Sequence, residues 1–105
     1  MGIFQIEIYT SMERNPAISI VRQGLISREG WISNHQLFSN KLASIAFEMP
    51  SDGLAGFLAD LKSAGLKPQY DAALPAVGDR EITGTIALTF LHDEPDMKRE
   101  VPAFG

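Results

Sequence analysis

The stretch KLASIAFEMPSDGLAGFLADLKSAGL, residues 41–66, joins a strand pattern directly to a helix pattern. In its first half, every second residue is apolar, so that the apolar residues share one face of an extended chain and the residues between them share the other. This pattern is typical of a half-buried strand. The apolar face consists of Ala43, Ile45, Phe47 and Met49. In its second half, apolar residues recur at i, i+3, i+4 and i+7, the spacing of a helix that packs on a core. These residues are Leu54, Phe57, Leu58 and Leu61.

Both ends of this helix have sequence signals. Ser51 is a residue type that caps helix N-termini. Gly65 suits the left-handed position just past the C-terminal end, and Leu66 can make the hydrophobic contact that accompanies such a cap. Pro68 prevents the helix from continuing. We therefore predict a helix over residues 51–65.

The N-terminal part of the chain predicts a second strand and a second helix. Residues 3–10 alternate between apolar and polar types, as in a half-buried strand. Asn15-Pro16 forms a helix start, because asparagine favours the N-cap and proline suits the first helical position. Gly30 suits the left-handed position past the end of this helix. We predict the helix over residues 16–29.

The remaining segments predict further strands. Residues 31–49 are interpreted as two strands joined by a tight turn at Ser39-Asn40. Residues 82–91 alternate again and predict the last clear strand. The long loop before that strand begins with residues 67–71, which can form a short edge strand.

The predicted order is strand, helix, strand, strand, helix, strand. This order favours the α+β class, as a ferredoxin-like βαββαβ sandwich with an antiparallel sheet, two helices on one face and an extra short edge strand. Right-handed crossovers are expected to put the first and third strands in the centre of the sheet. We assign residues 1–91 to a single domain and residues 92–105 to an extended C-terminal arm, because the arm is charged and has no period.

The composition limits the functions that need to be considered. The chain has 105 residues, which suffice for one domain, and its net charge of −4 argues against a nucleic-acid binder. The absence of cysteine excludes disulfides, thiolate metal sites and a cysteine nucleophile. No apolar run approaches the roughly 20 residues of a membrane span. We expect a cytoplasmic domain with no cofactor, no metal, and no nucleic-acid or membrane partner.

The junction between the first strand and the first helix is the strongest candidate site. It ends a strand and opens a helix, so free backbone N–H groups there can bind an anion or a carboxylate. Asn15 can add a side-chain contact. A simple helix cap explains the same residues, and this alternative stays open.

The run Arg14-Asn15-Pro16-Ala17-Ile18 at this junction resembles the motif that the ACT domain family of small-molecule sensors carries between its first strand and first helix. The proline and the aliphatic residue of the motif fit, whereas Ala17 stands where the family has glycine. Residues 41–66 also look like the second half of such a domain. The resemblance implies a non-catalytic regulatory module, a homodimer that binds an amino acid or a small metabolite between its subunits. The implied ligand-binding residues are Arg14, Asn15, Ala17, Ile18, Asn34 and His35.

Two other functions stay open. The first is a structural or protein-interaction module without a ligand, with the arm of residues 92–105 as its contact. The second is a small enzyme with a pocket at a subunit interface, in which His35 acts as a general acid or base beside Glu7 or Glu48. The lone Trp31 either packs in the core, stacks on a ligand or anchors a dimer.

Overall fold

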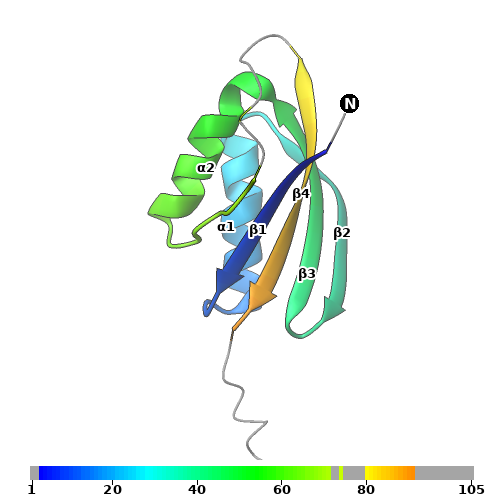
Figure 1. Cartoon of the computed structure of the whole chain (residues 1–105), viewed down its shortest axis with the longest axis vertical. Helices are drawn as coiled ribbons and strands as arrows, with labels where there is room; N and C mark the ends of the chain where they lie inside the picture. Colours follow the sequence, from blue (N-terminus) through cyan, green and yellow to red (C-terminus); the bar gives the residue numbers. More distant parts are fainter. Residues whose placement is uncertain (1–2, 72–73, 75–79, 92–105) are drawn as a thin grey trace, which may run out of the picture.

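The expected strands and helices occur in the expected order in the computed structural model, which describes residues 3–71, 74 and 80–91 (Figure 1). The elements are β1 (Phe4–Thr10), α1 (Arg14–Ser27), β2 (Trp31–Ser39), β3 (Leu42–Pro50), a 3₁₀ turn (Ser51–Gly53), α2 (Leu54–Ser63) and β4 (Glu81–Phe90). Both helices lie on the same side of the sheet (Figure 1). This arrangement confirms the predicted α+β class with a ferredoxin-like order of elements.

The order of strands in the sheet is β1-β4-β3-β2. β1 is parallel to β4, and the other neighbours are antiparallel, so the sheet is mixed and not wholly antiparallel as predicted. The prediction that the first and third strands are central is therefore wrong, because β3 and β4 are central and β1 lies near an edge. An alternating pattern identifies the buried face of a strand but does not identify its neighbours.

One row of residues explains how β4 fits between β1 and β3. Phe4, Gly84 and Phe47 lie directly beside one another in this row. A Cβ on Gly84 would collide with the Phe47 ring and lie 2.8 Å from the Phe4 carbonyl oxygen, so glycine is required there. The Phe47 ring also packs on Phe57 of α2, with ring centroids 5.8 Å apart. The predicted apolar faces of β3 and α2 thus meet in one core.

The C-terminal end of α2 matches its prediction. The N–H of Gly65 donates to the carbonyl oxygen of Lys62, and the N–H of Leu66 donates to that of Leu61. Gly65 has a φ of 97°, which is the left-handed conformation expected past a helix end. Leu66 is fully buried, as the accompanying hydrophobic contact requires.

The end of α1 has the same hydrogen bonds but a different left-handed residue. The N–H groups of Glu29 and Gly30 donate to the carbonyl oxygens of Ile26 and Leu25. Glu29, with a φ of 66°, takes the left-handed position that was predicted for Gly30. Gly30 is required for another reason, because a Cβ there would lie 2.8 Å from the Cβ of Met49. The end of α1 therefore contacts β3 through a residue without a side chain.

α1 begins two residues earlier than predicted. Glu13 is the N-cap residue, with an extended backbone, and its carbonyl accepts the first helical hydrogen bond from the N–H of Ala17. Asn15 therefore lies inside the first turn, and Pro16 occupies the third helical position. Proline is tolerated there because N–H groups in the first turn have no helical acceptor.

α2 begins later than predicted. Ser51 lies in the 3₁₀ turn rather than at the N-cap of the α-helix, which is Gly53. The backbone N–H of Ser51 donates to the carbonyl oxygen of Arg80, 3.0 Å away. This hydrogen bond joins the segment after β3 to the segment before β4.

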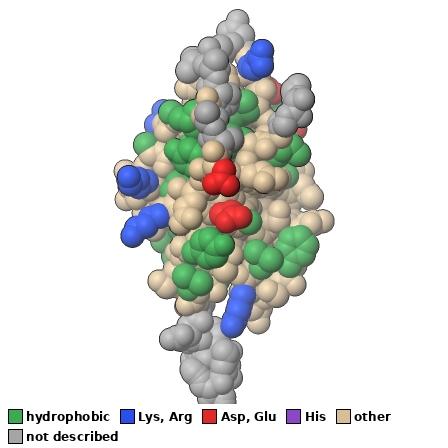
Figure 2. Space-filling view, in the orientation of Figure 1, with side chains coloured by type: hydrophobic (Ala, Val, Ile, Leu, Met, Phe, Trp, Pro, Cys, Tyr) green, Lys and Arg blue, Asp and Glu red, His purple; other side chains and the backbone are tan. Residues whose placement is uncertain are grey.

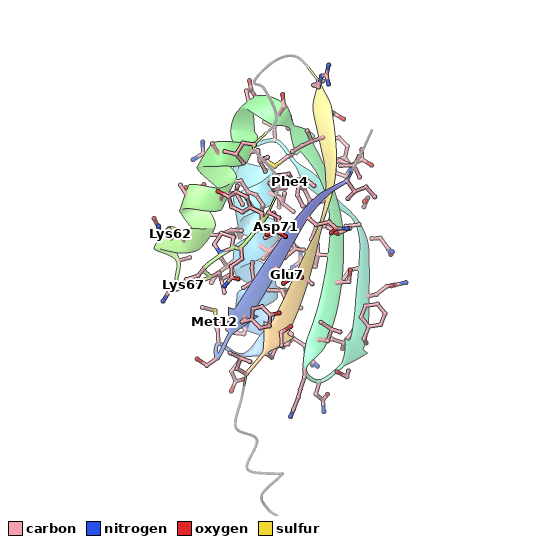
Figure 3. The ribbon with its side chains drawn as sticks, in the orientation of Figure 1. Phe4, Glu7, Met12, Lys62, Lys67 and Asp71 are labelled. Atoms are coloured by element: carbon pink, nitrogen blue, oxygen red, sulfur yellow. The ribbon has the colours of Figure 1, made fainter. Side chains whose placement is uncertain are left out.

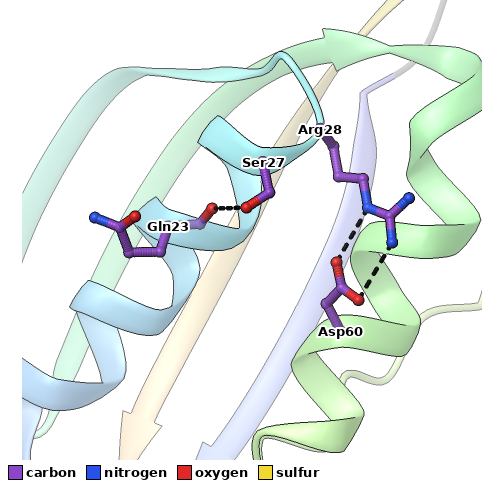
Figure 4. A network of polar contacts seen from close by, with 4 residues as sticks. All are labelled: Gln23, Ser27, Arg28 and Asp60. Carbon is purple, nitrogen blue, oxygen red and sulfur yellow. Dashed lines mark hydrogen bonds and ion pairs between the residues drawn. The ribbon is translucent and has the colours of Figure 1, made fainter.

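An ion pair links the two helices on the side away from the sheet (Figure 4). Arg28 donates from Nε to one carboxylate oxygen of Asp60 at 3.0 Å and from Nη2 to the other at 3.3 Å. The hydrogen bond and the charge of Asp60 raise the pKa of the Arg28 guanidinium. A Cβ on Gly56 would lie 2.6 Å from Nη1 of Arg28, so the guanidinium lies over the backbone of α2. Ser27 donates to the carbonyl oxygen of Gln23, one turn earlier in α1.

Candidate functional site

The structure separates the residues of the predicted ligand site. Ala17 and Ile18 belong to the hydrophobic core, and Ile18 is only 7% exposed. Arg14 is half-buried and Asn15 is exposed in the first turn of α1. Of the predicted residues at this junction, Arg14 and Asn15 therefore have side chains that a ligand could reach, next to backbone N–H groups of the helix start.

The other two predicted residues lie on opposite faces of β2. Directly paired residues in a sheet share a face. Asn34 pairs with Ala46, which faces away from the helices, whereas His35 pairs with the buried Ile45. Asn34 is thus on the other side of the sheet from the start of α1. The structure does not bring the predicted ligand residues together within one chain.

The carboxylates expected to assist His35 are also on the opposite face. Glu7 and Glu48 alternate with buried residues of β1 and β3, so they face away from the helices, whereas His35 is on the helix side. His35 is exposed and lines neither of the two pockets described below. This geometry separates His35 from both carboxylates that were expected to assist it.

β2 forms an open edge of the sheet. It is the last strand in the order, and within the described part of the chain no strand pairs with its outer side. Its sequence, WISNHQLFS, contains no charged residue and no proline, the residue types that usually block an edge. Trp31, Leu37 and Phe38 are 45%, 49% and 60% exposed. Core packing of Trp31 is therefore excluded, and β2 combines unpaired backbone groups with exposed apolar side chains.

The β1 edge is covered by a later segment of the chain. We call residues 66–71 the return segment, because they lead the chain from α2 back beside β1. The N–H of Gln69 donates to the carbonyl oxygen of Glu7, and the N–H of Glu7 donates to that of Gln69, both at 2.8 Å. A short edge strand was predicted at residues 67–71, and the structure has a single antiparallel bridge there.

Side chains hold the return segment in place. Leu66 is fully buried in the core. Four residues further on, the Tyr70 ring packs on the Phe4 ring of β1, with centroids 5.5 Å apart. The segment is thus fixed at both ends, and its backbone occupies hydrogen-bonding groups of β1 that would otherwise be open.

A shallow acidic pocket of about 220 Å³ lies on one side of the return segment. Figure 2 shows two acidic side chains close together on this face, and Figure 3 labels Glu7 and Asp71 there. The lining residues are Ile3, Gln5, Glu7, Gln69, Tyr70 and Asp71. Among the described residues, no group of three or more side chains could hold a metal ion.

A larger groove of about 450 Å³ lies on the other side, between the return segment and α2. Lys62 and Lys67 are at its border, on the same side of the molecule (Figure 3). The remaining lining is mostly apolar, so we call it the basic groove. Its lining residues are Ala55, Leu58, Ala59, Lys62, Lys67, Pro68, Tyr70 and Leu74.

The structure defines the chain as a small α+β domain with two unlike sheet edges. No family model, curated protein or solved structure matches the chain. In the ranges that the structure describes, no helix is long and apolar enough to cross a membrane. The similarity to ACT domains stays a prediction from the sequence.

Sequence reasoning missed Leu37 and Phe38 on the open edge and the two lysines of the basic groove. A signal for the edge is present in residues 31–39, which lack both charge and a regular apolar alternation. A signal for the groove is weaker: Lys62 follows Ala55 and Ala59 at helical spacing on a face with small side chains. The other border of the groove, formed by the return segment and Leu74, depends on how the chain folds back on α2 and has no local sequence pattern.

Proposed function

We propose that this chain is a non-catalytic binding module that works as a homodimer, in which the β2 strands of two copies pair antiparallel. The observation that carries the proposal is the open edge of β2, with nine uncharged residues and exposed Leu37 and Phe38. A long uncharged edge strand is a template for pairing with another strand. Two such domains would form one continuous eight-stranded sheet with all helices on one side.

Symmetry restricts the register of this pairing. A two-fold axis perpendicular to the sheet keeps each residue on its own face, so one residue of β2 must lie opposite its own copy. His35 is the middle residue of Trp31–Ser39. A register centred on His35 puts Asn34 opposite Gln36 of the second copy, and both residues lie on the sheet face away from the helices.

The flanking charges favour the same register. In it, Glu29, just before β2, approaches Lys41, just after β2, of the second copy, and the contact occurs twice by symmetry. Both side chains are exposed in the single chain. Opposite charges at both ends of an uncharged strand select one register and one partner, which is a second copy of this chain.

Small-molecule sensing remains a second candidate, and Arg14 and Asn15 in the first turn of α1 support it. Both side chains are accessible beside the N–H groups of a helix start, where a carboxylate of an amino-acid-like ligand would be favoured. In this case the domain is a regulatory module of the kind that the ACT resemblance implies.

The dimer is tested by measuring the mass in solution and then exchanging the two charges. Sedimentation or light scattering is expected to give twice the 11.5 kDa of one chain. Lys41→Glu alone is expected to weaken the dimer, because it puts two carboxylates at each end of the interface. The double variant Glu29→Lys/Lys41→Glu is expected to restore the affinity.

Lys67→Glu is the matched control, since it makes the same charge change away from β2 and is expected to leave the dimer intact. A monomeric mass at high protein concentration would contradict the proposal. Failure of the double variant to restore the dimer would contradict the register. Residues 92–105 lie outside the described residues, and loss of the dimer on deleting 95–105 would favour the arm as its contact.

A further inference from the structure

We infer that the basic groove binds a small amphiphilic carboxylate, with its apolar chain along α2 and its carboxylate between Lys62 and Lys67. The inference is independent of the proposed dimer. The groove lies between α2 and the return segment beside β1, whereas the proposed dimer forms at β2, at the other end of the strand order. It names a ligand position that differs from the start of α1.

The floor of the groove suits an alkyl chain. Ala55, Leu58 and Ala59 line it from α2, and the two alanines leave space where larger side chains would fill it. Tyr70 and Leu74 line the other side and are 40% and 42% exposed, so apolar surface remains open to solvent. The volume of about 450 Å³ lies in the range typical of small-ligand sites, about 300–1,000 Å³.

The charges of the groove select an anion. Lys62 and Lys67 are exposed, and neither makes an ion pair with a carboxylate of the described residues. The acidic residues nearest in the sequence are directed elsewhere, since Asp60 binds Arg28 and Asp71 lines the acidic pocket. Lys62 and Lys67 thus give one groove two positive charges on a chain whose net charge is −4.

The lysines are not needed to complete the helix. The last carbonyls of α2 already accept hydrogen bonds from the backbone N–H groups of Ala64, Gly65 and Leu66. The lysine ammonium groups therefore remain available for a ligand carboxylate, which accepts strong hydrogen bonds from charged donors. An apolar trough with a positive end is complementary to a molecule with an alkyl chain and one carboxylate.

The experiment titrates the full chain with octanoate, octanol and acetate, and follows backbone amides by NMR together with thermal unfolding. We expect octanoate to raise the melting temperature and to shift amides of α2 and the return segment. Octanol, without the charge, and acetate, without the chain, are expected to bind at least about tenfold more weakly. Similar binding of octanol and octanoate would overturn the role of the lysines.

Two variants test the position. Lys62→Gln/Lys67→Gln is expected to reduce octanoate affinity by about tenfold or more. Arg22→Gln/Arg80→Gln, the matched control that removes two charges from exposed residues outside the groove, is expected to leave it unchanged. Ala59→Leu fills the groove with a good helix former and is expected to abolish binding without loss of folding. Octanoate binding that survives both groove variants would overturn the inference, as would the absence of binding.

Discussion

At the β1 edge of the sheet, Gln69 of the return segment donates one hydrogen bond to Glu7 and accepts one from it. At the β2 edge, no strand of the described residues pairs with the outer side of nine uncharged residues. The covered edge depends on a buried anchor, Leu66, and on the packing of Tyr70 on Phe4. The open edge has exposed apolar side chains instead. Within the part of the chain that the structure describes, the fold covers one edge internally and leaves the other uncovered, which is the feature that the proposed dimer uses.

The largest expected effect is the loss of the anchor of the covered edge. Leu66→Ala removes a fully buried side chain and is expected to lower the free energy of unfolding by about 2–5 kcal/mol. Denaturant unfolding measures this change. Leu42→Ala is the matched control at the β2–β3 hairpin, where the side chain is exposed, and its cost is expected to stay near 0.5 kcal/mol (about the value of ordinary surface substitutions). Equal costs would show that the return segment is not anchored as described.

The next effect is on the open edge. His35→Asp puts two carboxylates opposite each other in the proposed dimer, and like charges there are expected to raise its dissociation constant by about tenfold to a hundredfold. Sedimentation equilibrium measures this constant. Asn34→Asp has the same change of charge one residue away but lies opposite Gln36 of the second copy, so a clearly smaller effect is expected. If both variants behave alike, the register is not centred on residue 35.

A smaller effect is expected from the bridge that covers β1. Gln69→Pro removes the N–H that donates to the carbonyl oxygen of Glu7, and the expected cost is about 1 kcal/mol. Hydrogen exchange at the Glu7 amide is expected to become faster, because its acceptor lies in the same bridge. Gln69→Ala keeps the backbone donor and serves as the control. Unchanged exchange in the proline variant would mean that the bridge contributes little to covering this edge.

The smallest effect on stability is expected at the start of α1. Asn15 does not cap the helix, so Asn15→Ala is expected to change the melting temperature little. The same variant is informative in a thermal-shift screen with amino acids. A shift that the natural chain shows and Asn15→Ala loses would support the sensing function, whereas a clear loss of stability without ligand would reveal a capping role.

The residues that were predicted well have signals that are local. The i, i+3, i+4, i+7 spacing and the glycine at position 65 define both the buried face and the end of α2 without reference to other segments. The alternation in β3 likewise fixes which of its residues are buried. In these elements the nearest neighbours along the chain determine the structure.

The predictions that failed depend on contacts between distant segments. Position 30 requires glycine because Met49 lies next to it and leaves no space for a side chain. The left-handed conformation is taken by Glu29. The position of β4 between β1 and β3 requires Gly84 beside Phe47, a pair separated by many residues. Of the candidate site at the start of α1, Arg14 and Asn15 keep side chains that a ligand could reach, whereas the burial of Ala17 and Ile18 follows from tertiary packing.

The central position of β4 also has a consequence for the order of folding. β1 and the β2–β3 hairpin do not touch as neighbouring strands, and the strand that joins them spans residues 81–90. On the ribosome, the first 80 residues can form two separate pieces of sheet but no complete sheet. Because joining β1 to β4 closes a loop of some 80 residues, this step is expected to limit the folding rate. The sheet of β1 to β4 is therefore completed only after residues 81–90 have been synthesised.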